Sequence, residues 1–339
     1  MSQAKLEKKV VILGAGVIGL TTAIVLLENE FQVTVVAEHL PGNLHPYYTS
    51  PWAGAHWRSY ADKNDHVGLE NDRFTFFKFM ELCEQEDKSL IKLCKSLEYW
   101  SKKPLDYEGP WFKDITPNFR EIDVKDLPKS VEFGIQYDAM CINAPKYLLW
   151  LKEKFTALGG AMIEKRVGHF NECFALGKAN VVINCSGLGA LTLGGLEDQA
   201  VFPTRGQTIL IEAPHIDYSL TKHLNDEIVY LIPRGDGTVV LGGTREANSK
   251  ISNPDPATAQ TILERCQEVT GGLGEFRIIQ HNVGFRPTRE GGMRLSLEKL
   301  QINENVYYIC HHYGHGGFGF QSSWGSANNV LHKIKSLFL

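Results

Sequence analysis

The chain has 339 residues, of which 43% are hydrophobic and 22% charged, and its formal net charge is −4. These values exclude a disordered, collagenous or coiled-coil chain, and the length favours two domains or one elaborate domain. A nucleic-acid-binding protein would usually be basic, so that class is disfavoured. The seven cysteines include no Cys-x-x-Cys pair, which argues against a disulfide scaffold or zinc site and for a reducing compartment.

The N-terminal segment predicts a strand, a turn, a helix and a second strand. Residues 10–13 and 32–37 are rich in β-branched side chains, as in strands buried on both faces. Between them, a glycine-rich turn at 14–19 is followed by a helical pattern over 20–30. The apolar run over 10–27 also resembles a signal peptide or membrane anchor, but its internal glycines and the absence of a cleavage site disfavour that interpretation. We therefore expect no membrane association.

The glycine-rich turn has the spacing Gly14-x-Gly16-x-x-Gly19. Gly14 permits the tight turn, Gly16 lets a pyrophosphate approach the backbone, and Gly19 lets the helix pack on the strand. The helix N-terminus would then face the phosphates, and Glu38 would bind ribose hydroxyls. The pattern predicts dinucleotide binding and does not decide between NAD and FAD. The expected contacts are Gly14, Ala15, Gly16, Val17, Ile18, Gly19 and Glu38.

The middle of the chain predicts loops, helices and one further nucleotide-type strand. Residues 41–57 are rich in proline, glycine and aromatic residues and predict a loop, whereas 71–96 contain helical material. Residues 100–140 predict a loop-rich, partly β region, and 146–155 predict an amphipathic helix. A buried strand over 181–185 then enters a tight turn.

The remaining chain predicts a second sheet and then returns to the nucleotide-type pattern. The expected elements are strands at 207–212, 229–232, 238–241 and 306–310 and a helix over 253–270. Nucleotide-type strands thus occur at the start, middle and end of the chain, so a domain interrupted by another explains the order better than two tandem domains.

We therefore expect an α/β fold with two interleaved domains. The first is a Rossmann-like FAD-binding domain made of residues 1–58, 141–204 and 280–339. The second is a mixed, mostly antiparallel β domain for the substrate, made of 59–140 and 205–279.

Two further patterns carry chemistry. Residues 313–321 are rich in glycine and let the backbone approach a flat ring, beside which a following helix would place positive potential. Arg205, Arg245 and Arg286 lie on predicted β segments and suit a carboxylate, although a structural ion pair is the usual role of a single arginine. Tyr230 could point a hydroxyl into a site or fill the core. No metal site is expected, because the clustered histidines lack acidic partners at ligand spacing.

Taken together, these motifs resemble the D-amino-acid oxidase family of FAD enzymes over nearly the whole chain. The segments that carry the resemblance are VVILGAGVIGLTTA at 10–23, SPWAGAHW at 50–57, VVINCSGLGA at 181–190, PTRGQTILI at 203–211, YLIPR at 230–234, VVLGGTR at 239–245, VGFRPTREGG at 283–292 and HHYGHGGFGFQSSWG at 311–325.

The resemblance implies an extended FAD whose pyrophosphate lies at the N-terminal turn. It implies further cofactor contacts from Ser50, Ala53, Gly54, Val167, Ser186, Gly187, Gly316, Gly317, Gly319, Phe320 and Gln321. It also implies that Arg286 and Tyr230 bind the substrate α-carboxylate and that the carbonyl near Gly317 accepts from the amine. His56 is a further candidate for the substrate site. A lid tyrosine before Tyr230 is not placed, and Tyr218 is the nearest candidate.

Arg245 bears on the choice of substrate. Family members that act on D-aspartate carry the pattern G-G-T-R, which is present at 242–245. An arginine in an apolar pocket favours acidic substrates, because a buried unpaired charge is costly. We expect oxidative deamination of acidic D-amino acids, chiefly D-aspartate, with oxygen as the second substrate and no side chain acting as acid or base. The alternatives are an oxidase of neutral D-amino acids, an NAD-dependent dehydrogenase and a non-catalytic nucleotide-binding regulator.

The family resemblance also implies a location. Its members are commonly peroxisomal and often end in a Ser-Lys-Leu-like tripeptide, whereas this chain ends in S-L-F-L. We expect a peroxisomal protein, with the cytoplasm as the alternative. The expected partners are small molecules, and the sequence leaves a homo-oligomer open.

Overall fold

The computed structural model describes residues 7–105, 107–224 and 228–338. In this part of the chain, one sheet has six strands in the order β14-β15-β7-β1-β2-β6. All neighbours in it are parallel except β14 and β15, which form an antiparallel hairpin. The strands are β1 (Lys9–Leu13), β2 (Gln32–Ala37), β6 (Ala161–Glu164), β7 (Val181–Asn184), β14 (Arg294–Ile302) and β15 (Asn305–Tyr313).

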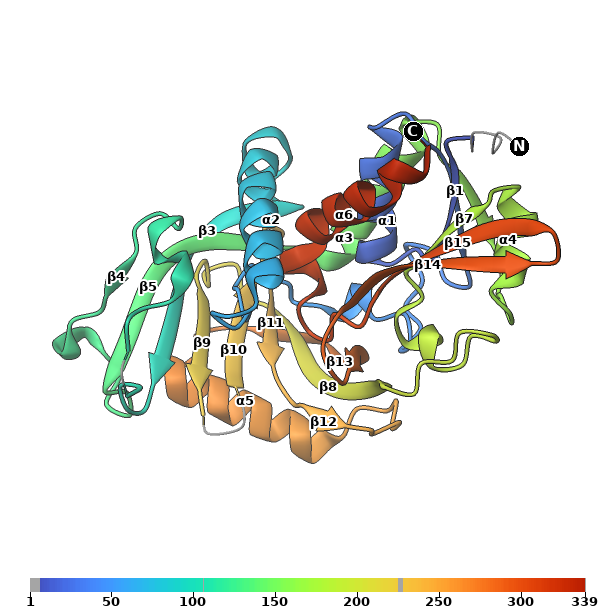
Figure 1. Cartoon of the computed structure of the whole chain (residues 1–339). Coiled ribbons are helices and arrows are strands. Elements are labelled where there is room, and N and C mark those ends of the chain that lie inside the picture. Colours follow the sequence, from blue (N-terminus) through green and yellow to red (C-terminus); the bar gives the residue numbers. More distant parts are fainter. Residues whose placement is uncertain (1–6, 106, 225–227, 339) are drawn as a thin grey trace.

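Helices cover both faces of this first sheet. Val10 and Ile12 of β1 point to one face and Val11 and Leu13 to the other, because side chains alternate along a strand. One face packs against α1 (Val17–Leu27), α3 (Ala144–Ala157) and α6 (Gly319–Lys335), which Figure 1 shows gathered together. The short helix α4 (Asn171–Gly177) packs on the other face. None of the helices in the described ranges is long and apolar enough to cross a membrane.

The second sheet has nine strands in the described residues and is mostly antiparallel. Its main order is β12-β8-β11-β10-β9-β3-β5-β4, and β13 pairs along β8. Helix α5 (Pro256–Thr270) buries its apolar side on this sheet (Figure 1). The strands are β3 (Ile91–Trp100), β4 (Arg120–Glu121), β5 (Phe133–Ile142), β8 (Val201–Glu212), β9 (Ser219–His223), β10 (Ile228–Pro233), β11 (Thr238–Gly242), β12 (Glu246–Ala247) and β13 (Arg277–Arg289).

The expected fold class is confirmed, and the helical region expected over 71–96 is confirmed only in its first part. Residues 91–96 were included in a helical region, but they begin strand β3. The helix before them, α2 (His66–Gln85), ends earlier, and strand β5 pairs with β3 along its full length. Long-range pairing of this kind overrides the local helical pattern.

The expected domain limits stay a prediction, but the elements near them are now placed. Strand β13 begins before the expected limit at residue 280 and pairs with β8 in the second sheet. Helix α2 packs against α6, where the Thr75 hydroxyl accepts from the Gly325 N–H at 3.0 Å. Strand β13 therefore crosses the expected limit at residue 280, and helix α2 of the expected substrate domain contacts α6 of the expected FAD-binding domain.

Candidate cofactor and substrate site

A single cavity of about 1240 Å³ is lined by the glycine-rich turn, by both sheets and by the start of α6. It exceeds the roughly 300–1,000 Å³ of ordinary small-molecule sites, so it has room for a dinucleotide and a small substrate together. Every residue assigned to the cofactor or the substrate from the sequence lines this cavity except Gly19, whereas the further candidates Arg205 and Tyr218 lie outside it. The sequence therefore identified residues that the fold brings to one place, although their individual roles stay predictions.

The glycines of the N-terminal turn fit their expected roles. Gly14 has a φ of 110°, and a Cβ there would overlap the Cys185 carbonyl. A Cβ on Gly19 would overlap the Gly14 carbonyl, so this glycine serves the packing of α1 rather than the cavity. A Cβ on Gly16 would lie 2.9 Å from the Ser50 hydroxyl and would protrude where a phosphate must approach.

Two helices begin at this cavity, and in neither does the N-cap residue provide a side-chain hydrogen bond. Helix α1 has Gly16 at its N-cap and no acidic residue in its first turn, and the Ser50 hydroxyl accepts from the Val17 N–H at 3.0 Å. Helix α6 begins at Gly319, and Phe318 before it provides no side-chain cap. Helix N-termini carry positive potential and free N–H groups. FAD fits this arrangement, because its pyrophosphate suits α1 and its electron-rich flavin suits α6.

The expected ribose and adenine contacts lie together in the same cavity. Glu38 is half-exposed, and its carboxylate is 3.9 Å from the Arg166 guanidinium. An exposed pair at this distance contributes little, so the carboxylate remains available to ribose hydroxyls. Val167 follows Arg166 and also lines the cavity.

The loop beside the expected flavin position is held by Arg234, which the sequence did not single out. Its Nε donates to the Gly54 carbonyl at 2.9 Å, and its Nη2 donates to the Ala53 carbonyl at 3.1 Å. Burial lowers the pKa of Arg234 to about 10. A Cβ on Gly54 would overlap the Ile232 side chain, so the loop lies tightly on β10.

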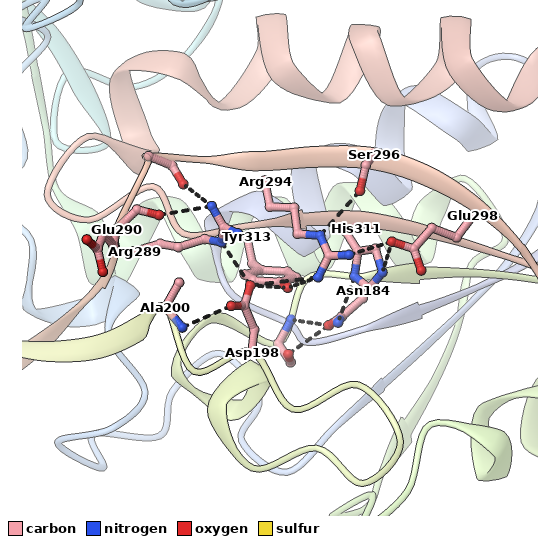
Figure 2. A network of polar contacts seen from close by, with 12 residues as sticks. Asn184, Asp198, Ala200, Arg289, Glu290, Arg294, Ser296, Glu298, His311 and Tyr313 are labelled. Carbon is pink, nitrogen blue, oxygen red and sulfur yellow. Dashed lines mark hydrogen bonds and ion pairs between the residues drawn. The ribbon is translucent and has the colours of Figure 1, made fainter.

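A polar network supports the far wall of the cavity (Figure 2). The side-chain carbonyl of Asn184 accepts from both the hydroxyl and the N–H of Ser186, at 2.7 and 3.2 Å, and so fixes the Ser186–Gly187 turn. Asp198 accepts from the Tyr313 hydroxyl at 2.7 Å and from Arg289 at 2.8 Å. The network therefore holds the cavity-lining residues Ser186 and Tyr313 in place through contacts between distant segments, which no single motif would have revealed.

At the other end of the cavity, Arg286 on β13 and Tyr230 on β10 lie together. The guanidinium donates to the Thr244 carbonyl at 3.1 Å and lies against Gly206, where a side chain would collide with it. Burial raises the pKa of the Tyr230 hydroxyl, while a hydrogen bond and the charge of Arg286 oppose that rise. A Cβ on Gly317 would lie 3.4 Å from Arg286 Cδ. This geometry suits a carboxylate, which accepts from both donors.

The other two arginines differ sharply from each other. Arg245 lines the cavity, is exposed, and has no hydrogen-bond or ion-pair partner among the described residues. Arg205 lies outside the cavity lining and is buried. It binds the Glu246 carboxylate at 2.6 Å and the Ile251 and Asn253 carbonyls at 2.8 and 3.0 Å. Arg205 is therefore structural, whereas Arg245 is free to meet a ligand.

His56 lines the cavity, but its ring is held by two serines. Its Nε2 lies 2.8 Å from the Ser96 hydroxyl and 3.2 Å from the Ser219 hydroxyl. Burial lowers the pKa of His56 to about 4, so the ring is neutral near pH 7. Tyr218, the lid candidate, does not line the cavity, and its ring lies 5.7 Å from the Lys95 ammonium. Residues 225–227 of that segment lie outside the described residues.

The cavity thus joins a glycine-rich helix N-terminus that suits a dinucleotide to an end where Arg286 and Tyr230 suit a carboxylate, an arrangement that fits a nucleotide-dependent oxidoreductase. A family model described as FAD dependent oxidoreductase matches residues 9–331. A D-amino-acid oxidase from Fusarium vanettenii is 33% identical over 97% of this chain and 97% of its own length. A D-aspartate oxidase from Talaromyces thermophilus is 30% identical over 95% of this chain and 94% of its own.

The chain belongs to the D-amino-acid oxidase family of FAD-dependent oxidoreductases. Its cofactor is FAD. Among solved structures, glycine oxidase from Geobacillus kaustophilus has the same fold, with a TM-score of 0.77 at 15% identity over 96% of this chain and 94% of the other.

Proposed function

We propose that this oxidase acts on acidic D-amino acids, chiefly D-aspartate, and forms the 2-oxo acid, ammonia and hydrogen peroxide. The observation that carries the proposal is Arg245, an unpaired guanidinium in the cavity that holds Arg286 and Tyr230. A D-amino acid with a side-chain carboxylate offers a partner for each arginine. A neutral side chain would leave Arg245 without a partner on the substrate.

The α-carboxylate is assigned to Arg286 and Tyr230. A guanidinium binds a carboxylate through two parallel N–H bonds, and the Tyr230 hydroxyl donates a third hydrogen bond. The carbonyl near Gly317, next to Arg286, accepts from the α-amine. Three separate contacts around Cα select one hand of the amino acid and fix the direction of its hydrogen.

Bound FAD would supply the oxidation by taking up a hydride and passing the electrons to oxygen, and water would hydrolyse the resulting imino acid to the 2-oxo acid and ammonia. The residues of this chain orient the substrate and stabilise its charges. His56 is neutral and engaged with Ser96 and Ser219, so it is not assigned a proton-transfer role. Positioning by itself can supply a large part of a rate enhancement.

An oxidase of neutral D-amino acids is the second candidate. Relatives named D-amino-acid oxidase, from Fusarium vanettenii and Schizosaccharomyces pombe, are each 33% identical to this chain. The exposure of Arg245 also favours this candidate, since an exposed side chain can turn toward solvent.

A peroxide assay separates the two candidates. Wild type and Arg245→Met are tested on D-aspartate, D-glutamate, N-methyl-D-aspartate, D-alanine and L-aspartate, with the visible flavin spectrum recorded. We expect wild type to prefer D-aspartate and Arg245→Met to lose at least about tenfold in kcat/KM for it, the value of roughly 1.4 kcal/mol of lost binding. Arg277→Met is the matched control, because Arg277 is exposed on β13 away from the cavity. Unchanged turnover of D-aspartate by Arg245→Met would refute the acidic preference.

A further inference from the structure

The segment after the flavin loop alternates between cavity and core. His56, Arg58 and Tyr60 line the cavity, whereas Trp57 and Ser59 do not. Trp57 is fully buried with its ring centroid 4.7 Å from that of Phe76. Side chains of extended backbone point alternately to opposite sides, so every second residue here faces the substrate end. Arg58 therefore brings a further guanidinium to the cavity that contains Arg245.

Arg58 is held by a buried carboxylate. Its Nε and Nη2 donate to the two oxygens of Glu98 at 3.0 to 3.3 Å, and its Nη1 donates to the Ser59 carbonyl at 2.9 Å. The side chain of Glu98 is 1% exposed, and it also accepts from the Tyr137 hydroxyl at 2.6 Å and lies 2.8 Å from His223 Nε2. Arg58 lowers the pKa of Glu98 well below its usual range against the opposing effect of burial. Glu98 is thus ionised, fully occupied and unable to bind a ligand.

This clamp leaves part of the Arg58 guanidinium unused. An arginine side chain carries five N–H bonds, and the contacts with Glu98 and Ser59 use three of them. One N–H remains on each terminal nitrogen, with no further partner among the residues that the structure describes. Two N–H bonds on neighbouring nitrogens match the two oxygens of a carboxylate.

The Tyr60 ring packs against both Arg58 and Phe318. The Arg58 guanidinium lies over the Tyr60 ring, 4.0 Å from its centroid, and Phe318 lies 5.1 Å from the same ring. Tyr60, Arg58 and Arg245 all line the same cavity.

We propose that Arg58 is a second specificity-determining residue for the side-chain carboxylate of the substrate, and that Glu98 is the positioning residue that holds its guanidinium toward the cavity. The inference rests on the proposed acidic preference. The substrate carboxylate accepts from the free N–H pair of Arg58 and is also attracted by Arg245. A substrate without that carboxylate leaves these donors unpaired, which lowers its relative rate.

The test compares variants by the ratio of kcat/KM for D-aspartate to kcat/KM for D-alanine. Arg58→Met with Glu98→Met removes both charges, so that no buried ion loses its partner. Arg58→Lys keeps a cation but loses the planar fork. Glu98→Gln keeps Arg58 but replaces the ion pair that holds its guanidinium by weaker neutral hydrogen bonds. Arg277→Met with Glu212→Met is the matched control, since it removes an Arg–Glu pair that is exposed and outside the cavity lining.

We expect the ratio to fall at least about tenfold in the double variant and less in Arg58→Lys, with no change in the control. In Glu98→Gln we expect KM for D-aspartate to rise more than kcat changes, because a loosened donor weakens binding first. The Kd of malonate, measured through the change in the flavin spectrum, should rise in the same variants. This measurement reports binding without turnover.

The outcomes separate this inference from the proposed function. A wild type that prefers D-alanine would overturn the proposed function and this inference with it. A wild type that prefers D-aspartate, combined with an unchanged ratio and unchanged malonate Kd in both Arg58 variants, would overturn this inference alone. If the double variant loses its bound flavin, Arg58→Lys alone provides the test. An unchanged ratio of kcat/KM for D-aspartate to kcat/KM for D-alanine in Arg58→Lys would then overturn this inference.

Discussion

The side-chain amide of Gln321 donates a 2.8 Å hydrogen bond to the carboxylate of Asp72. This contact joins the start of α6, at the cofactor cavity, to helix α2. The same carboxylate oxygen accepts from the Ser59 hydroxyl at 2.6 Å, next to Arg58. Gln321 lines the cavity, but its NH₂ group is committed to Asp72. Asp72 therefore couples the expected cofactor end of α6 to the segment that carries the substrate-facing residues.

Asp72 should make stability depend on pH. Burial raises its pKa from 3.8 to about 7, so the folded protein keeps a proton that the unfolded chain releases. The stability from this group is complete below pH 3.8 and is lost as the pH rises to about 7. Asp72→Asn lacks this loss, so the melting temperature of the variant minus that of wild type should increase over this interval and then stay constant. Thermal melts at three pH values would show it, and a margin independent of pH would contradict the prediction.

Removing the planar guanidinium of Arg286 should lower kcat/KM for every D-amino-acid substrate. Arg286→Lys keeps the charge but loses the second parallel hydrogen bond to the α-carboxylate. We expect kcat/KM to fall about a hundredfold or more for D-aspartate and D-alanine alike, since a hydrogen bond to a charged group contributes roughly 1.5–3 kcal/mol and orientation is also lost. Steady-state kinetics on both substrates would measure this. A loss confined to D-aspartate would instead assign Arg286 to the side-chain carboxylate.

A methyl group on Gly16 should weaken the binding of FAD. The Cβ of Gly16→Ala would lie 2.9 Å from the Ser50 hydroxyl and would occupy the approach to the phosphate position. We expect the Kd for FAD, titrated into apoprotein, to rise at least about tenfold. Gly16→Ala with Ser50→Ala removes the collision with the hydroxyl but not the obstruction. Full recovery of affinity in that double variant would show that the collision with Ser50, and not the phosphate, was the cause.

His56 should lower the stability of the folded protein as the pH falls. Burial lowers its pKa from 6.5 to about 4, so the unfolded chain binds a proton between these values that the folded protein does not. Stability from this group is complete above pH 6.5 and is lost as the pH falls to about 4. His56→Gln keeps a hydrogen-bonding group for Ser96 and Ser219 and should lose less stability on acidification than wild type. Urea unfolding at pH 7 and pH 5 would test this, and equal losses would contradict it.

Local patterns identified most of the residues that line the cavity beside the glycine-rich turn, and their roles toward the cofactor stay predictions. The turn at Gly14 and Gly16 is recognisable because close backbone approach permits only glycine there, and the neighbouring strand and helix have clear periodicities. The resemblance of dispersed motifs then brought in residues such as Arg286 and Ser186, which line the same cavity. These residues belong to short contiguous motifs, which can be recognised in the sequence without knowledge of the fold.

Residues that act through distant partners were not predicted. Glu98 was missed because its contacts with Arg58, Tyr137 and His223 come from strands far apart in the chain. The helical expectation for 91–96 failed for the same reason, since pairing with β5 defines β3. The alternation from His56 to Tyr60 was the one local signal that could have revealed Arg58. The domain limits, the individual roles of the site residues and the peroxisomal location stay predictions.

The order of strands in the first sheet has a consequence for synthesis of the protein. Strand β15 pairs with β7, and α6 follows it to supply the second helix end of the cavity. A nascent chain that has not yet emerged beyond residue 321 possesses the pyrophosphate turn but lacks the other half of the cradle. FAD should therefore be acquired late, after most of the polypeptide has been made. The yellow colour of a preparation would then report that its molecules extend through α6, and truncated products would be colourless.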